Sequence, residues 1–330
     1  MTQMPELTVS IMVCDQRERG EHCLYALLNQ TAIQRMEILI IDFAPDQPPL
    51  AGSDHPAVRV LIGDLNSTYG LARLQGLQAA RAPLIAYLEE HVIVAPDWAE
   101  NVIKAFEADE RVAGVGPKTY NANPKYPLSR VFHLLHYQNS SEVTERIPAT
   151  FLMGQNSTYR VSALQQYLDN ADEIFGSEPI LNWKMAQDGH RLVVDPLVRV
   201  AHINETSAGM VMRGTYIWHR QYARSRVRLF NWSPIKRLGW LLATPLIPWV
   251  RLFRTFWHLQ RRQNPNWGDF FSLLPKIIAV YYAVAYGVFV GLVFGPGDAA
   301  QRFLEFEMNE ARMYDKNFQP FLAEITADRG

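Results

Sequence analysis

Single aspartates stand at the ends of two short apolar runs near the start of the chain. Asp15 follows the run Leu7–Val13, and Asp42 closes the run Met36–Ile41. Apolar runs of this length, bounded by polar residues, are typical of buried strands. Ligands of open α/β sheets bind beyond the carboxyl ends of the strands. Both aspartates are therefore candidates for contacting a polar ligand.

A third polar cluster, Glu89-Glu90-His91, follows the apolar run Leu84–Leu88. Carboxylates and a neutral imidazole can together hold a divalent ion such as Mn²⁺, whereas Mg²⁺ prefers oxygen ligands. The cluster is therefore a candidate metal site. A solvated surface loop is the other interpretation of these three residues taken alone.

These residues need a scaffold that brings the ends of several strands to one edge. Short apolar runs alternate with helical patterns in the first half of the chain. Besides the runs above, there are two further apolar runs, Ala57–Ile62 and Val112–Val115. Helical patterns occur at Gly20–Asn29, Tyr69–Ala80 and Asp97–Phe106. Strands that alternate with helices predict an α/β fold with a mainly parallel sheet and helices on both faces. We expect the three acidic strand ends to lie on one rim of that sheet.

The composition is typical of a globular protein, with 48% hydrophobic residues, 20% charged residues and a net charge of −1. A chain of 330 residues suits one large domain plus an appendage. Cys14 and Cys23 are the only cysteines, which argues against a disulfide framework or a cysteine zinc site. The start lacks a basic segment followed by an apolar one, so we expect no signal peptide and a cytosolic N-terminal part.

The near-neutral net charge hides an asymmetry. Between Thr206 and Gly268 there is no Asp or Glu. The same stretch carries a block of basic residues, namely Arg213, Arg220, Arg224, Arg226, Arg228, Lys236, Arg237, Arg251, Arg254, Arg261 and Arg262. A cationic block beside Trp-rich, apolar sequence is attracted to anionic lipid by roughly 1 kcal/mol per basic residue. RNA is the competing ligand, but no RNA-binding signature accompanies the block, so we expect a membrane surface and no nucleic acid.

Two apolar segments in the last third support contact with a membrane. Leu238–Val250 is uncharged but only 13 residues long, which fits a segment that lies in the interface. Ile277–Gly297 is uncharged over 21 residues, long enough to cross a bilayer. Gly287 and Gly291 within it have the GxxxG spacing that lets another helix approach closely. A buried helical hairpin, a crossing helix and a re-entrant or in-plane arrangement all remain compatible with this pattern.

Several segments occur in the order found in one large enzyme family. They are Val9–Val13, Glu37–Asp42, Gly70–Arg73 followed by Gly76, Leu84–His91 and Pro96–Trp98. From Leu7 to about His202 the chain resembles the family 2 glycosyltransferases, which are inverting enzymes with the GT-A fold. The segment Cys14–Arg17 departs from the proline-threonine-tyrosine-asparagine loop of the family.

The resemblance implies a set of residues that bind the nucleotide-sugar donor. In the family, the aspartate at the end of the second strand hydrogen-bonds the nucleotide base, which implies that role for Asp42. The other positions implied to contact the donor are Asp15, Arg17, Arg73, Glu89 and Asn156. An ordinary strand position is the alternative for Asn156.

The metal motif of the family, Asp-x-Asp, is replaced here by Glu89-Glu90-His91. The resemblance implies Glu89 and His91 as ligands of a divalent ion, Mn²⁺ or Mg²⁺, with His202 after the closing strand as a further ligand. Such an ion acts as a Lewis acid on the leaving diphosphate. A lone histidine after an apolar strand is otherwise more often a core or turn residue.

The pair Ser177-Glu178 resembles the Glu-Asp pair whose second carboxylate is the catalytic base of the family. An inverting transfer needs one base that takes a proton from the acceptor hydroxyl. The resemblance therefore implies Glu178 as the base. An ordinary glutamate at a helix N-terminus, where the helix dipole favours a carboxylate, is the alternative.

We therefore predict a GT-A catalytic domain over residues 1–212 and a helical, basic and apolar membrane-associating region over residues 213–330. The predicted function is transfer of a sugar from a UDP- or GDP-sugar to a lipid-linked or glycan acceptor in polysaccharide biosynthesis. The predicted location is the cytoplasmic face of a membrane, with peripheral, re-entrant or single-pass attachment. Because the metal motif is altered, a non-catalytic GT-A-fold binding subunit of a glycan-assembly complex is the alternative. A nucleotidyltransferase is disfavoured, since no glycine-rich loop follows the first apolar run.

Overall fold

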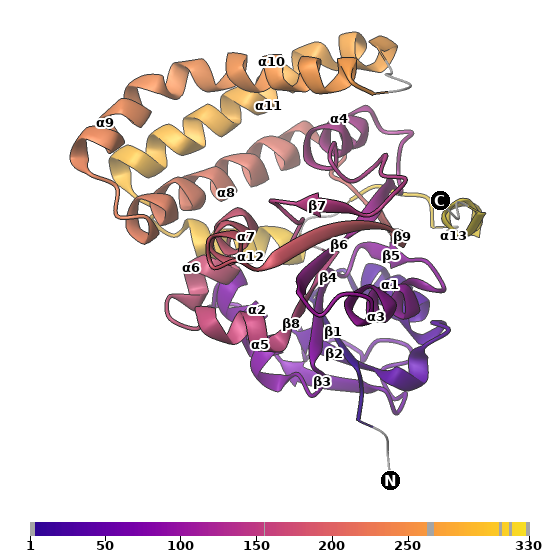
Figure 1. The fold of residues 1–330 in the computed structure, drawn as a ribbon. Coiled ribbons are helices and arrows are strands. Elements are labelled where there is room, and N and C mark those ends of the chain that lie inside the picture. Colours follow the sequence, from indigo (N-terminus) through magenta and orange to yellow (C-terminus); the bar gives the residue numbers. More distant parts are fainter. Residues whose placement is uncertain (1–3, 155, 263–266, 310–311, 317–318, 328–330) are drawn as a thin grey trace. The chain divides into compact units, whose positions relative to one another are not determined.

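The computed structural model describes residues 4–154, 156–262, 267–309, 312–316 and 319–327 (Figure 1). The first three residues, which belong to the start examined for a signal peptide, lie outside the described residues. The chain forms two compact units: the first comprises residues 1–122, 139–203 and 314–330, and the second residues 123–138 and 204–313. A domain boundary between residues 212 and 213 stays a prediction.

In the described part of the first unit, the strands form a single sheet (Figure 1). The strands are β1 (Leu7–Val13), β2 (Met36–Asp42), β3 (Val58–Ile62), β4 (Leu84–Glu89), β5 (Val92–Val94), β6 (Val112–Asn121), β7 (Ile147–Ala149), β8 (Asn156–Arg160) and β9 (Arg191–His202). Their order is β3-β2-β1-β4-β8-β6-β9-β5, and β7 pairs with β9. The parallel pairs β1–β2, β1–β4, β2–β3 and β6–β9 confirm the predicted mainly parallel α/β sheet. The polar strand β8 runs antiparallel between β4 and β6, and its sequence carries little strand signal.

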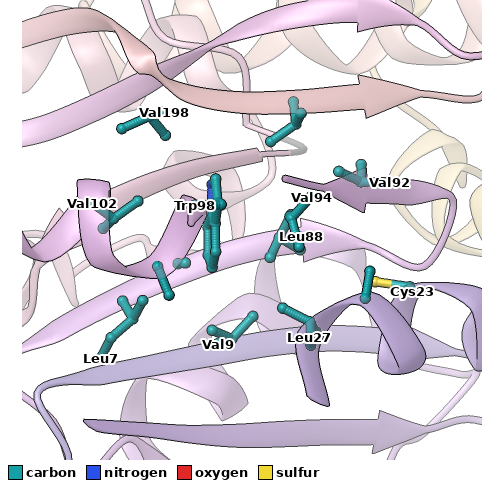
Figure 2. Packing of buried hydrophobic residues seen from close by; sticks show 14 of the residues in the cluster. Leu7, Val9, Cys23, Leu27, Leu88, Val92, Val94, Trp98, Val102 and Val198 are labelled. Atoms are coloured by element: carbon teal, nitrogen blue, oxygen red, sulfur yellow. The ribbon is translucent and has the colours of Figure 1, made fainter. Parts of the chain in front are cut away.

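Helices cover both faces of this sheet. They are α1 (Arg17–Leu28), α2 (Tyr69–Ala79), α3 (Trp98–Glu107), α5 (Val161–Leu164), α6 (Ala171–Phe175), α7 (Glu178–Gln187) and α13 (Gln319–Ala327), with 3₁₀ turns η1 (Ile33–Arg35) and η2 (Gln165–Tyr167). Because side chains alternate along a strand, Leu7 and Val9 of β1 share a core with α1 and α3, and Figure 2 shows Trp98 in the middle of it. Ser10, on the other face of β1, lies against Gly76 of α2, where a Cβ would come within 2.5 Å of the serine hydroxyl.

The register of the parallel strands brings the acidic strand ends to one edge. Asp42 of β2 lies beside Val13 at the end of β1. Glu89 of β4 lies beside Met12 on the other side of β1. The two carboxylates therefore flank the carboxyl end of the same central strand, which is where ligands of such sheets bind.

The second unit consists of helices. They are α4 (Pro127–His136), α8 (Ala208–Leu229), α9 (Pro234–Ala243), α10 (Ile247–Gln260), α11 (Trp267–Phe294) and α12 (Ala299–Asn309), with a 3₁₀ turn η3 (Thr244–Leu246) between α9 and α10. Within the described residues, α11 is the one helix long and apolar enough to cross a membrane, and 61% of its most apolar window is buried inside the protein. A core helix of a soluble protein has the same character.

The GxxxG face of α11 packs against α8 of the same chain. A Cβ on Gly287 would lie 2.7 Å from the carbonyl oxygen of Tyr216, and a Cβ on Gly291 would collide with the carbonyl oxygen of Arg220. The two glycines therefore let the α8 and α11 backbones approach closely, as small residues do between helices.

We expect Gly291→Ala to destabilise the protein by about 1–3 kcal/mol, the usual cost of overpacking a close contact. A lowered apparent melting temperature in thermal unfolding would report this loss. Gly239→Ala on α9 is the matched control, since no atom lies within 4 Å of a Cβ built there. Alanine favours a helix interior over glycine, so the control should be neutral or stabilising. Equal melting temperatures for the two variants would contradict the close packing.

Candidate functional site

Three side chains suited to binding a metal converge where β4 and β9 end. Glu89 is the last residue of β4, His91 lies in the turn to β5, and His202 is the last residue of β9. β5 and β9 are antiparallel with Val92 opposite His202. The backbone N–H of Ile203 also donates to the carbonyl of His91 at 3.1 Å. Backbone pairing thus holds two histidines that are far apart in sequence side by side.

The donor atoms of these side chains are spaced as they would be around a single ion. Glu89 Oε2 lies 2.8 Å from His91 Nε2 and 3.4 Å from His202 Nε2. The two Nε2 atoms are 3.0 Å apart, and all three residues are buried. Metal bonds of about 2.1 Å that meet at about 90–110° separate neighbouring ligand atoms by about 3.0–3.4 Å. The residues therefore fit a divalent transition-metal ion, and one carboxylate with two imidazoles is a ligand set that such ions accept.

Glu89 is ionised and held in place. Its burial by itself raises the pKa of Glu89, but the charge and hydrogen bonds of His91 and His202 outweigh this effect and keep the pKa well below its ordinary value. Its other oxygen, Oε1, accepts a hydrogen bond of 2.8 Å from the hydroxyl of Tyr69. Oε2 of Glu89 is therefore the oxygen that faces the two imidazoles.

A chain of hydrogen bonds connects this cluster to Glu178, the first residue of α7. Arg73 donates to the hydroxyl of Tyr69 at 3.0 Å and to Glu178 Oε1 at 2.8 Å. The Arg73 guanidinium is buried and lies 4.4 Å from the centre of the Tyr69 ring. One arginine thus bridges Glu178 and the hydroxyl that orients Glu89.

Tyr69 was not among the site residues predicted from the sequence. It precedes Arg73 by four residues in a segment with a helical pattern, and residues at this spacing share one face of a helix. That spacing is the signal that could have identified it. Arg73, implied by the resemblance to bind the donor, lies buried between Tyr69 and Glu178.

Two buried polar side chains, at the start of β8 and just before α7, have no hydrogen-bond partner among the described residues. They are the amide of Asn156 and the hydroxyl of Ser177. Buried polar atoms are normally hydrogen-bonded. These groups are therefore suited to bind a polar ligand. Nearby, Gly154 lies so close to Glu178 that a Cβ would collide with the glutamate side chain.

The remaining predicted donor-binding residues lie at the ends of β1 and β2. Arg17 forms a two-pronged ion pair with Asp42, with N–O distances of 2.8 and 2.9 Å. The guanidinium also donates to the carbonyl of Pro48 at 2.8 Å, and Asp42 accepts from the backbone N–H of Ala44 at 2.9 Å. Asp15 lies exposed in the loop between β1 and α1. The structure therefore brings these three predicted residues to the same edge of the sheet.

The α/β fold with its mainly parallel sheet is like the GT-A fold. The chain is similar in structure to a mannosyltransferase, PcManGT from Pyrobaculum calidifontis, solved in complex with GDP-Man and Mn²⁺. The match has a TM-score of 0.53 and 16% sequence identity, and it covers 90% of this chain and 88% of that one. Residues 8–168, just under half of the chain, match the family model of glycosyl transferase family 2, and this match supports a glycosyltransferase of that family. A search of curated proteins finds no match to the chain.

Proposed function

We propose that this protein is an inverting, metal-dependent glycosyltransferase that moves a sugar from a nucleoside-diphosphate donor to a membrane-associated acceptor. The observation that carries the proposal is the buried cluster of Glu89, His91 and His202 at the rim of a family 2 domain. These three residues would hold a divalent ion such as Mn²⁺, which supplies Lewis-acid stabilisation of the leaving diphosphate.

The donor is a UDP- or GDP-sugar. The structural relative was solved with GDP-Man and Mn²⁺, which supports a nucleoside-diphosphate sugar as the ligand of this rim. Asp42 would contact the nucleotide, because it is the last residue of β2, and so would Asp15 and Arg17, which lie in the loop after β1 and at the start of α1. The unpartnered amide of Asn156 would contact the sugar.

Glu178 is the proposed general base. Its carboxylate takes the proton of an acceptor hydroxyl while that oxygen bonds to the anomeric carbon from the face opposite the diphosphate. The bond from the anomeric carbon to the diphosphate oxygen breaks at the same time, and the nucleoside diphosphate leaves with the electron pair. Arg73 holds one oxygen of Glu178, so the second oxygen remains to accept the proton.

An exposed apolar face on the second unit supports a membrane-associated acceptor. Its residues recur every three or four positions along α9, η3 and α10, and they are Ile235, Leu238, Leu242, Leu246, Trp249, Val250, Phe253 and Trp257. Exposed Lys236, Arg254 and Arg261 lie in the same segment, which carries no acidic residue. Apolar and basic residues on one helical segment are typical of helices that lie in the interface of anionic membranes.

We expect Leu242→Glu and Phe253→Glu each to weaken binding to vesicles of phosphatidylglycerol and phosphatidylcholine by at least about tenfold. Burial of either side chain is worth about 1.5–3 kcal/mol, and 1.4 kcal/mol corresponds to a tenfold change in affinity. Flotation of the full chain with such vesicles measures the effect, with the exposed Leu197→Glu of the first unit as the control. Binding unchanged in both variants would argue against this face.

The mode of attachment at the cytoplasmic face is tested on the wild type. Release from membranes by alkaline carbonate is expected if the apolar face of α9 and α10 is the anchor. Retention until detergent is added would instead indicate that α11 crosses the bilayer. Vesicles of phosphatidylcholine alone should bind more weakly, since the basic residues then lack anionic partners.

The function itself is tested by assaying release of nucleoside diphosphate from UDP- and GDP-sugars with Mn²⁺, with Mg²⁺ and with EDTA. Metal-dependent release and transfer are the expected results. Donor binding without turnover, unaffected by metal, would instead favour a non-catalytic binding subunit, for which the departure from the Asp-x-Asp motif is the supporting observation.

A further inference from the structure

Glu90 stands between two residues of the metal cluster in sequence but takes part in a different set of contacts. Its Oε1 forms an ion pair of 2.5 Å with Arg19 of α1. Its Oε2 lies 3.4 Å from Nδ1 of His91. Arg19 and Glu90 are both almost completely buried, with exposures of 2% and 1%. One carboxylate thus contacts a buried cation on one side and an imidazole of the proposed metal site on the other.

The stability of the fold is a weak explanation for this buried ion pair. Removing two charges from water costs several kcal/mol per ion, and well-packed apolar residues often replace such a pair without loss of stability. The position of the pair against His91 offers another explanation. A carboxylate beside a histidine ligand commonly fixes the ring orientation and the tautomer of that ligand.

The two ring nitrogens of His91 face different partners. Nε2 faces Glu89 and His202, while Nδ1 lies 3.4 Å from Oε2 of Glu90, a distance at which the two atoms form an ion-pair contact without hydrogen-bond geometry. A metal ligand must present a nitrogen without a proton, and which nitrogen is free depends on the hydrogen bond made by the other. A carboxylate this close to Nδ1 favours a proton on that nitrogen through its negative charge, which leaves the lone pair of Nε2 for the ion.

We infer that Glu90, held by Arg19, is a positioning residue that prepares His91 for metal binding. The inference rests on the metal site proposed above. Arg19 keeps the carboxylate from turning away, since it occupies Oε1 in a site closed to water. The site is thereby built in advance of the ion.

Glu90→Gln tests this role because it retains the size of the side chain. Arg19 can only donate, so it should hold the amide oxygen of the new side chain and turn the amide NH₂ toward Nδ1 of His91. That arrangement favours a proton on Nε2, the nitrogen required by the ion. We expect the affinity for Mn²⁺ to fall by about 10- to 100-fold, as for other losses of an outer partner of a metal ligand.

The measurement is a titration of the purified full chain with Mn²⁺, followed by electron paramagnetic resonance of the free ion. Asp195→Asn is the matched control, because it breaks another buried carboxylate's ion pair, with Arg146 at 2.5 Å, outside the metal cluster. The control should bind Mn²⁺ like the wild type. Wild-type affinity in Glu90→Gln would overturn the role of Glu90 alone, whereas a wild type that binds no Mn²⁺ would overturn the metal site as well.

A second measurement needs no substitution at Glu90. In wild-type protein labelled with ¹⁵N-histidine and loaded with Zn²⁺, nuclear magnetic resonance should find His91 bound through Nε2 with a proton on Nδ1. The His202→Ala spectrum separates the signals of the two histidines. Coordination of His91 through Nδ1 would contradict the inference even if Glu90→Gln failed to fold.

Discussion

Glu178→Gln should transfer sugar at least about a hundredfold more slowly than the wild type, in line with the loss of a general base. The amide cannot take the proton of the acceptor hydroxyl, but its oxygen can still accept the hydrogen bond of Arg73. We therefore expect kcat to fall while the KM for the donor and the affinity for Mn²⁺ stay close to the wild type. Initial rates at saturating acceptor, with Mn²⁺ binding measured on the same sample, check this result.

Glu107→Gln is the control for the Glu178 prediction, since it removes a largely exposed carboxylate from α3. It should retain wild-type activity. Activity of Glu178→Gln within about tenfold of the wild type would remove Glu178 from the role of base. A parallel loss of metal binding would instead indicate damage that spreads through Arg73 and Tyr69.

The second large effect is expected from His202→Ala, which removes one of the three converging donor atoms. Losing an outer partner of a metal ligand typically lowers metal affinity by about 10- to 100-fold. Losing a ligand itself should lower the affinity for Mn²⁺ by more than that. Activity should then require far more added metal or disappear. Titration of activity and of Mn²⁺ binding on one preparation measures both consequences.

His190→Ala is the control for this prediction, because His190 lies at the opposite end of β9 from His202, just before its first residue. It should bind metal like the wild type. Full activity of the wild-type enzyme in EDTA, or unchanged metal binding in His202→Ala, would contradict the assignment of the cluster.

The strands next to the site were predictable because they are continuous apolar runs. The runs at Leu7–Val13 and Met36–Ile41 became β1 and β2 with nearly the same bounds. Strand β8 was harder to predict, because four of its five residues, Asn-Ser-Thr-Tyr-Arg, are polar or charged and it is buried by neighbours distant in sequence. The exposure of the face on α9 and α10 also depends on packing that apolar composition alone does not specify.

The residues of the candidate site likewise fall into those that a local sequence pattern indicates and those that it does not. Glu89 and His91 lie two positions apart in sequence and carry their own signal, whereas His202 joins them only through the pairing of β5 with β9. The contact of Arg73 with Glu178 joins residues 105 positions apart, and no local pattern indicates it. The resemblance placed Arg73 among the donor-binding residues, and that role stays a prediction.

The helical unit is built from two separate stretches of the chain, and the chain returns to the sheet unit after each of them. The chain leaves the sheet unit at residue 122, returns at 139, leaves again at 203 and comes back at 314. After the last return, Ile325 is fully buried in the sheet core, and Tyr314 and Leu322 pack against it. A gene shortened to its first 203 codons would therefore yield a sheet with an uncovered apolar patch. A fragment limited to the first unit therefore has to retain the segment that begins at Tyr314.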